Sequence, residues 1–391
     1  MRKRWWMFRP IDWLCACLPR RRGGGLLIIR MDGIGDMALF QPYATAYAQA
    51  LGYTPETTTI LGVDSWRQLA PRLFPRFRVE TLSLKRYEKK FLYRLRMNLH
   101  LRRKGYDTVV APAHFRKIML HDSLVLATAA PTRIVAKAFR SDRTCHEFDW
   151  SEARMTRVIP TGEHPVHECE RHQRFLEQLL ETSLEPIRKI VDWVGEADAL
   201  SQDETHVVLN YGSTEPGRNW PVDNYIEIAK RLVADGVMPV FVGGDRETEA
   251  LPKINAAFAP GEIINLIGTT SLTGLMDVLK AADLVLSNET GPAHLAILVG
   301  TPTIMIYGGG HAGSFMPYPA DPEFDPIATF LDAPMECYGC LWDCKFPREE
   351  SDPFHCVASV AIDDVWTAVK QRLASTTSAE ATAQVARQHR A

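Results

Sequence analysis

The chain has 391 residues, of which 46% are hydrophobic and 24% are charged, and its formal net charge is −2. This composition is typical of soluble globular proteins, and no stretch approaches the roughly 20 apolar residues that a transmembrane helix requires. A chain of this length exceeds the size at which one hydrophobic core stops growing, so we expect two domains.

Residues 1–24 form a basic, tryptophan-rich segment. Residues 1–22 hold seven Lys or Arg against one acid, Asp12. Pro10 and Asp12 interrupt the segment and no small-residue cleavage site follows, which argues against a secretory signal and predicts a cytoplasmic protein. Interleaved cations and tryptophans favour contact with an anionic membrane surface, here the cytoplasmic face of the inner membrane, and a disordered basic tail is the alternative.

Strand-like and helix-like segments then alternate in two series, which predicts an α/β protein with parallel sheets. In the first series the expected strands are Leu26–Met31, Thr57–Leu61, Thr108–Ala111 and Arg133–Ala136. In the second series they are His206–Tyr211, Met238–Val242, Ile263–Leu266, Leu284–Ser287 and Thr303–Tyr307.

The boundaries between these regions follow from composition. We expect an N-terminal domain over residues 25–185 and a C-terminal domain over residues 204–372. The acidic segment 186–203 predicts the interdomain linker. Residues 373–391 are poor in apolar side chains, so we expect a disordered tail there.

The first candidate site follows the first strand. Asp32, Gly33, Gly35 and Asp36 lie in a loop between a strand and a helix, where sites of α/β proteins form. The glycines allow close approach of a ligand, and the third glycine of a dinucleotide fingerprint is missing. Asp36 could accept a proton from a sugar hydroxyl as a general base, or it could serve only as a helix N-cap.

A second basic run covers Lys85–Lys104, with nine Lys or Arg against Glu88. Its apolar residues recur at helical spacing, so one face should pack and the other should be cationic. This face could be merely solvated, or it could attract a phosphorylated or membrane-borne acceptor. No nucleic-acid-binding motif accompanies the charge, so we expect no nucleic-acid partner.

A second candidate site begins after the strand at His206. Ser213, Thr214 and Arg218 follow it in a glycine-containing loop, and this set of hydroxyl, N–H and guanidinium donors suits a diphosphate. Trp220 is more consistent with packing than with ligand stacking. Gly243 lies in a glycine pair after the next strand, which could admit a nucleotide or simply make a tight turn.

The segment Asp283–Pro302 predicts an anion-binding strand, turn and helix. Glu289, Thr290 and Gly291 form the turn, and His294 falls in the first helical turn. Free N–H groups at a helix N-terminus attract anions. The alternative is an ordinary cap at Thr290 with a packing role for His294.

Four cysteines gather near the C-terminus, at Cys337, Cys340, Cys344 and Cys356. In a cytosolic protein such a cluster favours metal over disulfides, so a structural Zn or Fe site is one interpretation. The spacing differs from that of a paired zinc ribbon, and free or buried thiols are the other interpretation.

Taken in order, these motifs resemble the heptosyltransferases of glycosyltransferase family 9, from about Leu26 to Trp366. The family's small-x-Gly-Asp loop is matched by Gly33-Ile34-Gly35-Asp36. Its cation before a Trp-Pro pair is matched by Arg218 with Trp220-Pro221, and its donor loop is matched at Thr290, Gly291 and His294. The family usually has Asp where this chain has Glu289, so either the donor-sugar contacts shift there or the site tolerates the longer carboxylate.

The resemblance implies a GT-B fold, with two Rossmann-like domains facing across a cleft. It implies inverting transfer of heptose from ADP-heptose to the lipopolysaccharide core, an anionic glycolipid, or to a related surface glycan, without a metal or other cofactor. Asp36 would be the general base, with Asp32, Gly33 and Gly35 in the acceptor-side loop. The donor would be bound by Arg218, Ser213, Thr214, Gly243, Glu289, Thr290, Gly291 and His294.

Three other functions remain compatible with the sequence. One is the same transfer chemistry onto a protein acceptor such as an adhesin. Another is a sugar-nucleotide epimerase or hydrolase on the same two-domain plan, which would consume donor without an acceptor. The last is a non-catalytic scaffold recruited to the membrane, which would bind no nucleoside diphosphate.

Overall fold

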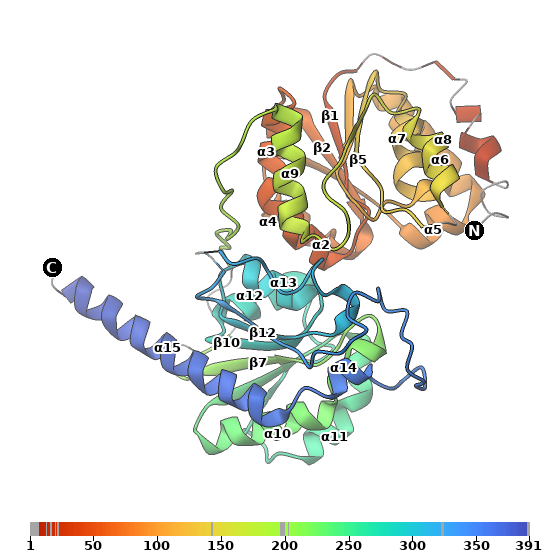
Figure 1. The fold of residues 1–391 in the computed structure, drawn as a ribbon. Helices are drawn as coiled ribbons and strands as arrows, with labels where there is room; N and C mark the ends of the chain where they lie inside the picture. The colour runs from red at the N-terminus through yellow and green to blue at the C-terminus, as the bar shows by residue number, and fades with distance from the viewer. Residues whose placement is uncertain are drawn as a thin grey trace. The chain divides into compact units, whose positions relative to one another are not determined.

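The computed structural model describes residues 8–388, except residues 13, 16–17, 20, 22, 142–143, 196–199, 202 and 322–323. The chain divides into two compact units, Met1–Ile187 and Arg188–Ala391. This division falls within the segment 186–203, where the acidic composition predicts the linker. Each unit is an α/β structure built on a parallel sheet, as the alternating pattern predicts (Figure 1).

The sheet of the first unit has six parallel strands in the order β3-β2-β1-β4-β5-β6. The strands are β1 (Leu26–Ile29), β2 (Thr58–Val63), β3 (Arg78–Leu82), β4 (Thr108–Ala111), β5 (Thr132–Ala136) and β6 (Arg157–Ile159). The central strand β1 reads Leu-Leu-Ile-Ile and is fully buried, because helices cover both faces of a parallel sheet.

Helices α3, α4 and α9 lie on one face of this sheet, and α5 to α8 lie on the other (Figure 1). The helices are α2 (Ile34–Phe40), α3 (Ala44–Ala50), α4 (Ala70–Leu73), α5 (Leu84–Lys89), α6 (Phe91–Lys104), α7 (Ser123–Thr128), α8 (Cys145–Glu152) and α9 (Glu168–Leu180). A short π-helix, η4 (Ile118–Asp122), precedes α7. The loops after β1, β4 and β5 meet at the carboxyl edge of the sheet, because these strands are neighbours.

The sheet of the second unit also has six parallel strands, in the order β12-β11-β10-β7-β8-β9. The strands are β7 (His206–Asn210), β8 (Met238–Val242), β9 (Ile264–Asn265), β10 (Leu284–Asn288), β11 (Thr303–Ile306) and β12 (Ala328–Leu331). Because β10 pairs with both β7 and β11, their carboxyl-end loops are adjacent and can form one site.

In this unit α12 and α13 cover one face of the sheet, and α10, α11 and α14 cover the other (Figure 1). The helices are α10 (Val222–Ala234), α11 (Leu251–Ala256), α12 (Leu272–Ala281), α13 (Gly291–Leu298), α14 (His355–Ala358) and α15 (Ile362–Gln388). Helix α15 continues through most of segment 373–391, which composition predicts to be disordered. This segment contains six Ala, and Ala is the strongest helix former.

Part of the basic N-terminal segment packs against the first unit. Residues 8–12 and 14–15 are helical. Phe8, Ile11 and Cys15 are buried there against Leu95 and Leu99 of α6 and Met119 of η4. These described residues are therefore docked on the fold, which differs from the alternative of a disordered tail.

One carboxylate anchors this segment. Asp12 accepts hydrogen bonds from the Arg94 guanidinium at 2.9 and 3.1 Å, from Asn98 at 2.8 Å and from the Ser123 hydroxyl at 2.8 Å. Arg94 is almost completely buried, so Asp12 neutralises a cation that water cannot reach.

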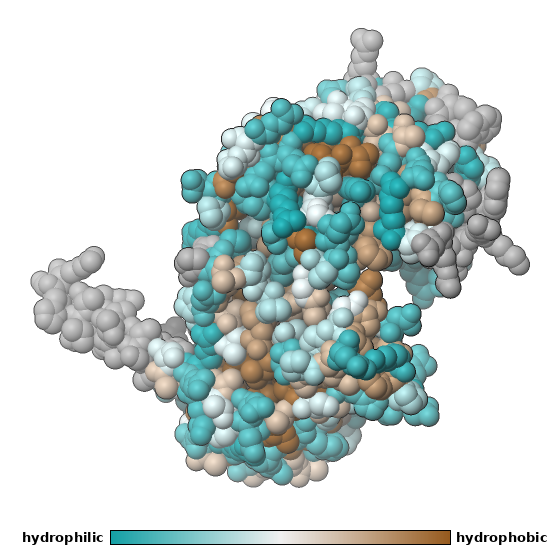
Figure 2. Space-filling view, viewed as in Figure 1, coloured by the Kyte–Doolittle hydropathy of each residue, from teal (hydrophilic) through white to brown (hydrophobic). Residues whose placement is uncertain are grey.

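Apolar and hydrophilic residues are interspersed over the molecular face in Figure 2. Among the residues that the structure describes, no helix combines the length and the hydropathy that a membrane span requires.

The Asp12 anchor leads to a stability prediction. We expect Asp12→Ala to destabilise the first unit by about 2–3 kcal/mol, because it leaves the buried Arg94 without its counter-ion. Urea unfolding of the full chain measures the effect. Asp64→Ala, which removes an exposed ion pair with Arg67, is the matched control and should cost less than about 1 kcal/mol. Equal effects of the two substitutions would contradict the anchor.

Candidate functional site

Two carboxylates follow β1 at the carboxyl edge of the first sheet. Gly33 is the N-cap of α2, and Asp36 lies in the first turn of that helix. The side chain of Asp36 therefore does not serve as the N-cap, which was the alternative interpretation. Asp36 lies four residues after Asp32, in the first turn of α2, and the buried strand β1 fixes the position of this turn.

A buried arginine organises these carboxylates. Arg30, at the end of β1, is 1% exposed. Its Nε lies 3.2 Å from Oδ2 of Asp32, and its Nη1 and Nη2 donate to Oε1 of Glu168 at 3.3 and 3.2 Å. Nη2 also donates to the main-chain oxygen of Asp36 at 3.5 Å. One guanidinium thus links the candidate loop to α9, the last helix of the unit.

This arrangement separates the acidities of the two aspartates. Burial raises the pKa of Asp36 to about 7, and the negative charge of Asp32 adds to that rise. Burial acts on Asp32 in the same sense, but the Arg30 charge and the nearby His121 side chain outweigh it and hold the pKa of Asp32 well below its usual range. A pair of carboxylates tuned apart in this way is typical of acid-base sites.

Two histidines complete the surroundings. Nε2 of His121, in η4, lies 3.6 Å from Oδ1 of Asp32. His172, in α9, bonds through Nδ1 to the hydroxyl of Tyr47 at 2.8 Å. Burial and the Arg30 charge lower the pKa of His172 well below its usual value, so this ring is neutral and adds no positive charge beside the carboxylates.

In the second unit, α13 begins as the sequence predicts. Thr290 is the N-cap, Gly291 is the first helical residue and Pro292 falls in the first turn. The Thr290 side chain makes no capping hydrogen bond, so its hydroxyl and the first N–H groups of the helix can bind an anion. His294 is 5% exposed, and its Nδ1 bonds to the Tyr318 hydroxyl at 2.6 Å, which is the packing role considered as its alternative.

Arg218 lies at the end of the short helix η5 (Pro216–Arg218), in the loop that follows β7. Its guanidinium stacks on the Trp342 ring, with Cζ 4.6 Å from the ring centroid. Its Nε is buried and makes no hydrogen bond to the described residues. A cation held on an aromatic ring without an acidic partner is suited to bind an anionic ligand.

Glu289 lies beside this turn and is 4% exposed. Its Oε1 lies 2.5 Å from Nδ1 of His311, and its Oε2 is buried without a hydrogen-bond partner among the described residues. His311 in turn contacts Trp342 edge to face at 5.3 Å. The longer carboxylate that replaces the family's usual Asp is therefore positioned by His311, with one oxygen left for a ligand hydroxyl.

Asn288 ties the two loops together, and sequence reasoning missed it. Its Oδ1 accepts hydrogen bonds from the main-chain N–H of Trp220 at 2.9 Å and from the Tyr225 hydroxyl at 3.1 Å. Its Nδ2 donates to the main-chain oxygen of Tyr211. The available sequence signal was an amide residue at the carboxyl end of an apolar strand, where a polar side chain needs hydrogen-bond partners. Trp220 is itself buried and packed, as expected.

The remaining predicted donor residues lie in neighbouring loops. Ser213 donates to the main-chain oxygen of Glu215 at 2.6 Å, and Thr214 is exposed. A Cβ at Gly243 would lie 2.7 Å from the side chain of Glu247. The absence of a side chain at Gly243 therefore leaves room for Glu247. In the structure, a side chain of the protein thus packs closely against Gly243.

The segment that carries Cys337, Cys340 and Cys344 forms a wall of the site around Arg218. The N–H groups of Gly339 and Leu341 donate to the carbonyls of Gly309 and Gly310 at 2.7 and 3.1 Å, which places Trp342 over the glycines that follow β11. The sequence did not show that this cysteine-containing segment positions Trp342 against Arg218, because Trp342 and Arg218 lie more than a hundred positions apart in the chain.

The structure does not confirm a metal site at the four cysteines. Cys337, Cys340, Cys344 and Cys356 are free thiols, and Cys356 accepts a hydrogen bond from the N–H of Gly309 at 3.4 Å. Over the described part of the chain, no three His, Cys, Asp or Glu side chains gather as metal ligands. A structural Zn or Fe at these thiols is therefore not confirmed and stays a prediction.

Comparison with known proteins places these motifs in a family. The family model described as glycosyltransferase family 9 (heptosyltransferase) matches residues 94–323. Lipopolysaccharide heptosyltransferase 2 of Escherichia coli is 29% identical over 114 residues, which cover 28% of this chain and 30% of that protein. This match thus spans less than a third of that relative's length.

Two further matches are longer. Lipopolysaccharide heptosyltransferase 1 of E. coli is 22% identical over 298 residues, which cover 72% of this chain and 87% of that protein. The structure of E. coli heptosyltransferase WaaC with ADP superposes with a TM-score of 0.64 at 18% identity, and covers 89% of this chain and 99% of that one. This likeness confirms the predicted α/β fold of the GT-B type. Because the family model matches more than half of the chain, the chain belongs to glycosyltransferase family 9, the heptosyltransferase family.

Proposed function

We propose that this chain is an inverting glycosyltransferase that moves heptose from ADP-heptose to a lipopolysaccharide core or a related surface glycan. Family membership supports the reaction class, and the ADP in the WaaC structure supports an ADP-linked donor. The observation that carries the proposal is the pair of carboxylates after β1, in which Asp36 has a pKa of about 7 while Asp32 stays ionised.

In the proposed reaction Asp36 takes the proton of the acceptor hydroxyl. The hydroxyl oxygen then attacks the anomeric carbon of the donor, and the bond between that carbon and the diphosphate oxygen breaks. The electron pair leaves with ADP, and the anomeric configuration inverts. The transfer uses no metal, because protein groups carry the charge stabilisation.

Arg218 and the N-terminus of α13 would provide that stabilisation. Both are positioned before the reaction, Arg218 by stacking on Trp342 and α13 by strand β10. Donors fixed where negative charge develops lower the barrier more than mobile donors do. Glu289 would accept a hydrogen bond from a donor-sugar hydroxyl through its unpartnered Oε2.

We also propose that the protein docks peripherally on the anionic cytoplasmic face of the inner membrane. At the start of α6, Phe91 and Leu92 are 51% and 75% exposed, and the neighbouring Lys89 and Lys90 are exposed as well. Exposed apolar residues beside cations suit an anionic lipid surface. Co-sedimentation with phosphatidylglycerol vesicles tests this, and no loss of binding in Leu92→Asp would contradict it.

The first test of the function replaces the base. Asp36→Asn should lower kcat for heptose transfer by about 10²–10⁴-fold, because the isosteric amide cannot accept the proton. ADP release from ADP-heptose with a heptose-deficient lipopolysaccharide acceptor measures the rate. ADP binding by calorimetry should stay unchanged.

Each other outcome of this assay has a clear meaning. Retained turnover in Asp36→Asn would overturn the assignment of the base. ADP release without an acceptor would favour a hydrolase or epimerase, and transfer only to an adhesin would favour a protein acceptor.

A second test uses pH. Asp36 must be ionised to act as a base, so kcat/KM should rise about tenfold per pH unit below its pKa and level off above about pH 7. Asp32→Asn removes the negative charge that raises the pKa of Asp36, so the midpoint should move to lower pH. Asp64→Asn, in the same unit but exposed and paired with Arg67, should leave the midpoint unchanged. A midpoint that Asp32→Asn leaves in place would contradict the coupling.

The third test concerns Arg218. Arg218→Ala should weaken ADP binding by about 10- to 100-fold, because hydrogen bonds from a charged donor contribute about 1.5–3 kcal/mol. The affinity of Arg218→Lys for ADP should fall between those of Arg218→Ala and the unchanged protein, since lysine keeps the charge and loses the planar guanidinium. Calorimetry with ADP measures both. Arg231→Ala on α10, whose partners are Glu227 and Asp363, is the control and should bind ADP as the unchanged protein does.

A further inference from the structure

A cavity of about 510 Å³ opens in the first unit, and the proposed reaction does not use it. This volume falls within the range of sites that take small ligands. The loops after β4 and β5, the π-helix η4, helix α8 and the N-terminal segment contribute its walls. Its apolar lining is formed by Phe8, Phe115, Ile118, Met119, Phe139 and Phe148.

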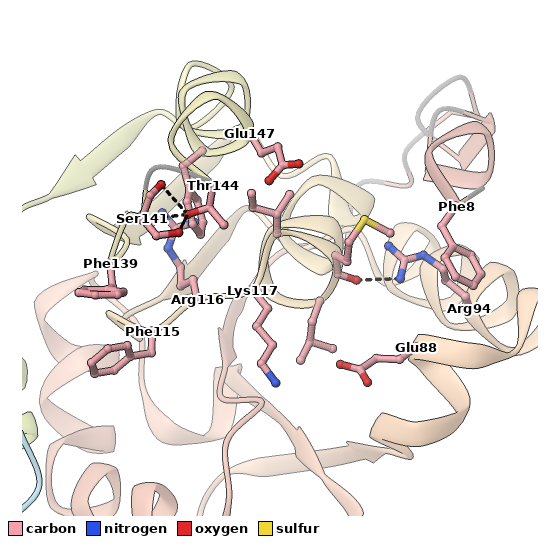
Figure 3. A pocket seen from close by; sticks show the side chains of 14 residues that line it. Phe8, Glu88, Arg94, Phe115, Arg116, Lys117, Phe139, Ser141, Thr144 and Glu147 are labelled. Carbon is pink, nitrogen blue, oxygen red and sulfur yellow. Dashed lines mark hydrogen bonds between the residues drawn. The ribbon is translucent and has the colours of Figure 1, made fainter. Parts of the chain in front are cut away.

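The cavity is elongated, and aromatic rings mark its two ends (Figure 3). Phe115 and Phe139 contact each other at one end, with ring centroids 5.3 Å apart. Phe8, from the N-terminal helix, lies at the other end beside Arg94. An extended apolar space between two aromatic ends matches the shape of a hydrocarbon chain.

The charges around the cavity do not favour an ionic ligand. Arg94 is neutralised by Asp12, and Arg116 by Asp122 and by Glu152 at 2.7 Å. The other charged lining residues are Glu88, Lys117 and Glu147, which include both signs and are at least partly exposed. In Figure 3 Lys117 lies between Phe115 and Glu88, and Glu147 lies beside Thr144.

The cavity shares a wall with the candidate base site. Leu120 of η4 lines the cavity, and the next residue, His121, lies 3.6 Å from Asp32. A chain bound in the cavity would therefore lie on the other side of a five-residue helix from the acceptor-side carboxylates. We propose that this cavity binds the hydrocarbon chain of an amphiphilic acceptor, an inference that rests on the proposed transfer to a membrane-borne glycan.

Direct binding tests this without any turnover. The probes are hexyl, heptyl and octyl glucoside at concentrations below micelle formation, titrated into the full-length protein by calorimetry, with glucose as the headgroup control. Each additional buried methylene should tighten binding about fourfold, and glucose should not bind at this site. Absence of saturable octyl glucoside binding would overturn the proposal.

Two variants locate the site. Ile118→Trp puts a larger side chain into the lining of the cavity, and Phe139→Ala removes one aromatic ring of the lining, so each should weaken octyl glucoside binding at least tenfold. Leu180→Trp adds the same indole at an exposed position outside the cavity and should bind as the unchanged protein does. Thermal unfolding without ligand shows whether each variant folds, and two folded variants with unchanged affinity would overturn the proposal.

A transfer assay then separates this inference from the proposed function. In Ile118→Trp, kcat/KM should fall for an acylated acceptor and stay unchanged for the same glycan without its acyl chains. An equal loss with both acceptors would contradict the chain site. Transfer to neither acceptor by the unchanged protein, with alkyl glucoside binding intact, would count against the proposed function and leave the cavity assignment standing.

Discussion

The candidate base site depends on one buried cation. Arg30 holds Asp32 and Glu168 by its guanidinium and contacts the main-chain oxygen of Asp36. A buried guanidinium is stable only with compensating acceptors, so the loop after β1 cannot rearrange without leaving this charge unpaired. Three carboxylates share one arginine. Burial raises the pKa of both Glu168 and Asp36, and the pKa of Asp36 reaches about 7 because the negative charge of Asp32 adds to the effect of burial. The same constraint that fixes the loop therefore produces a group able to exchange a proton near neutral pH.

The second unit shows the opposite electrostatic arrangement. Arg218 stacks on Trp342 and has no acidic partner among the described residues, and the first turn of α13 carries N–H groups that no side chain caps. Asn288 holds the loops that present these groups in a fixed relation. This site thus presents positioned donors beside one buried carboxylate, Glu289, whose Oε1 contacts His311. The two units differ electrostatically, because three carboxylates share Arg30 in the first, whereas Arg218 has no acidic partner among the described residues of the second.

The sequence predicts the elements that burial alone determines. Strands β4 and β8 match their predicted bounds, and β1, β7 and β10 differ by only one or two residues at their carboxyl ends, because apolar runs between glycine-rich loops mark buried parallel strands. Strands β3, β6 and β12 were missed because they carry polar residues, as at Arg78 and Arg157 near or at the sheet edges. The loops with Asp36 and Thr290 were found because glycine and carboxylate follow a strand. Glu168, Asn288 and Trp342 could not be assigned, since their roles arise from partners that lie far along the chain.

The N-terminal segment shows how one helix can serve both fold and surface. Phe8, Ile11 and Cys15 recur at helical spacing and face the first unit, whereas Leu14, on the other side, is 52% exposed. Asp12 is the acid that argues against a secretory signal, and it is also the group that docks the segment on Arg94. Without this acid the segment would keep its apolar contacts and the hydrogen bond from Arg102 to the main-chain oxygen of Leu18, but Arg94 would lose its counter-ion. Because Asp12 fixes the inner face, Phe8 can close one end of the apolar cavity.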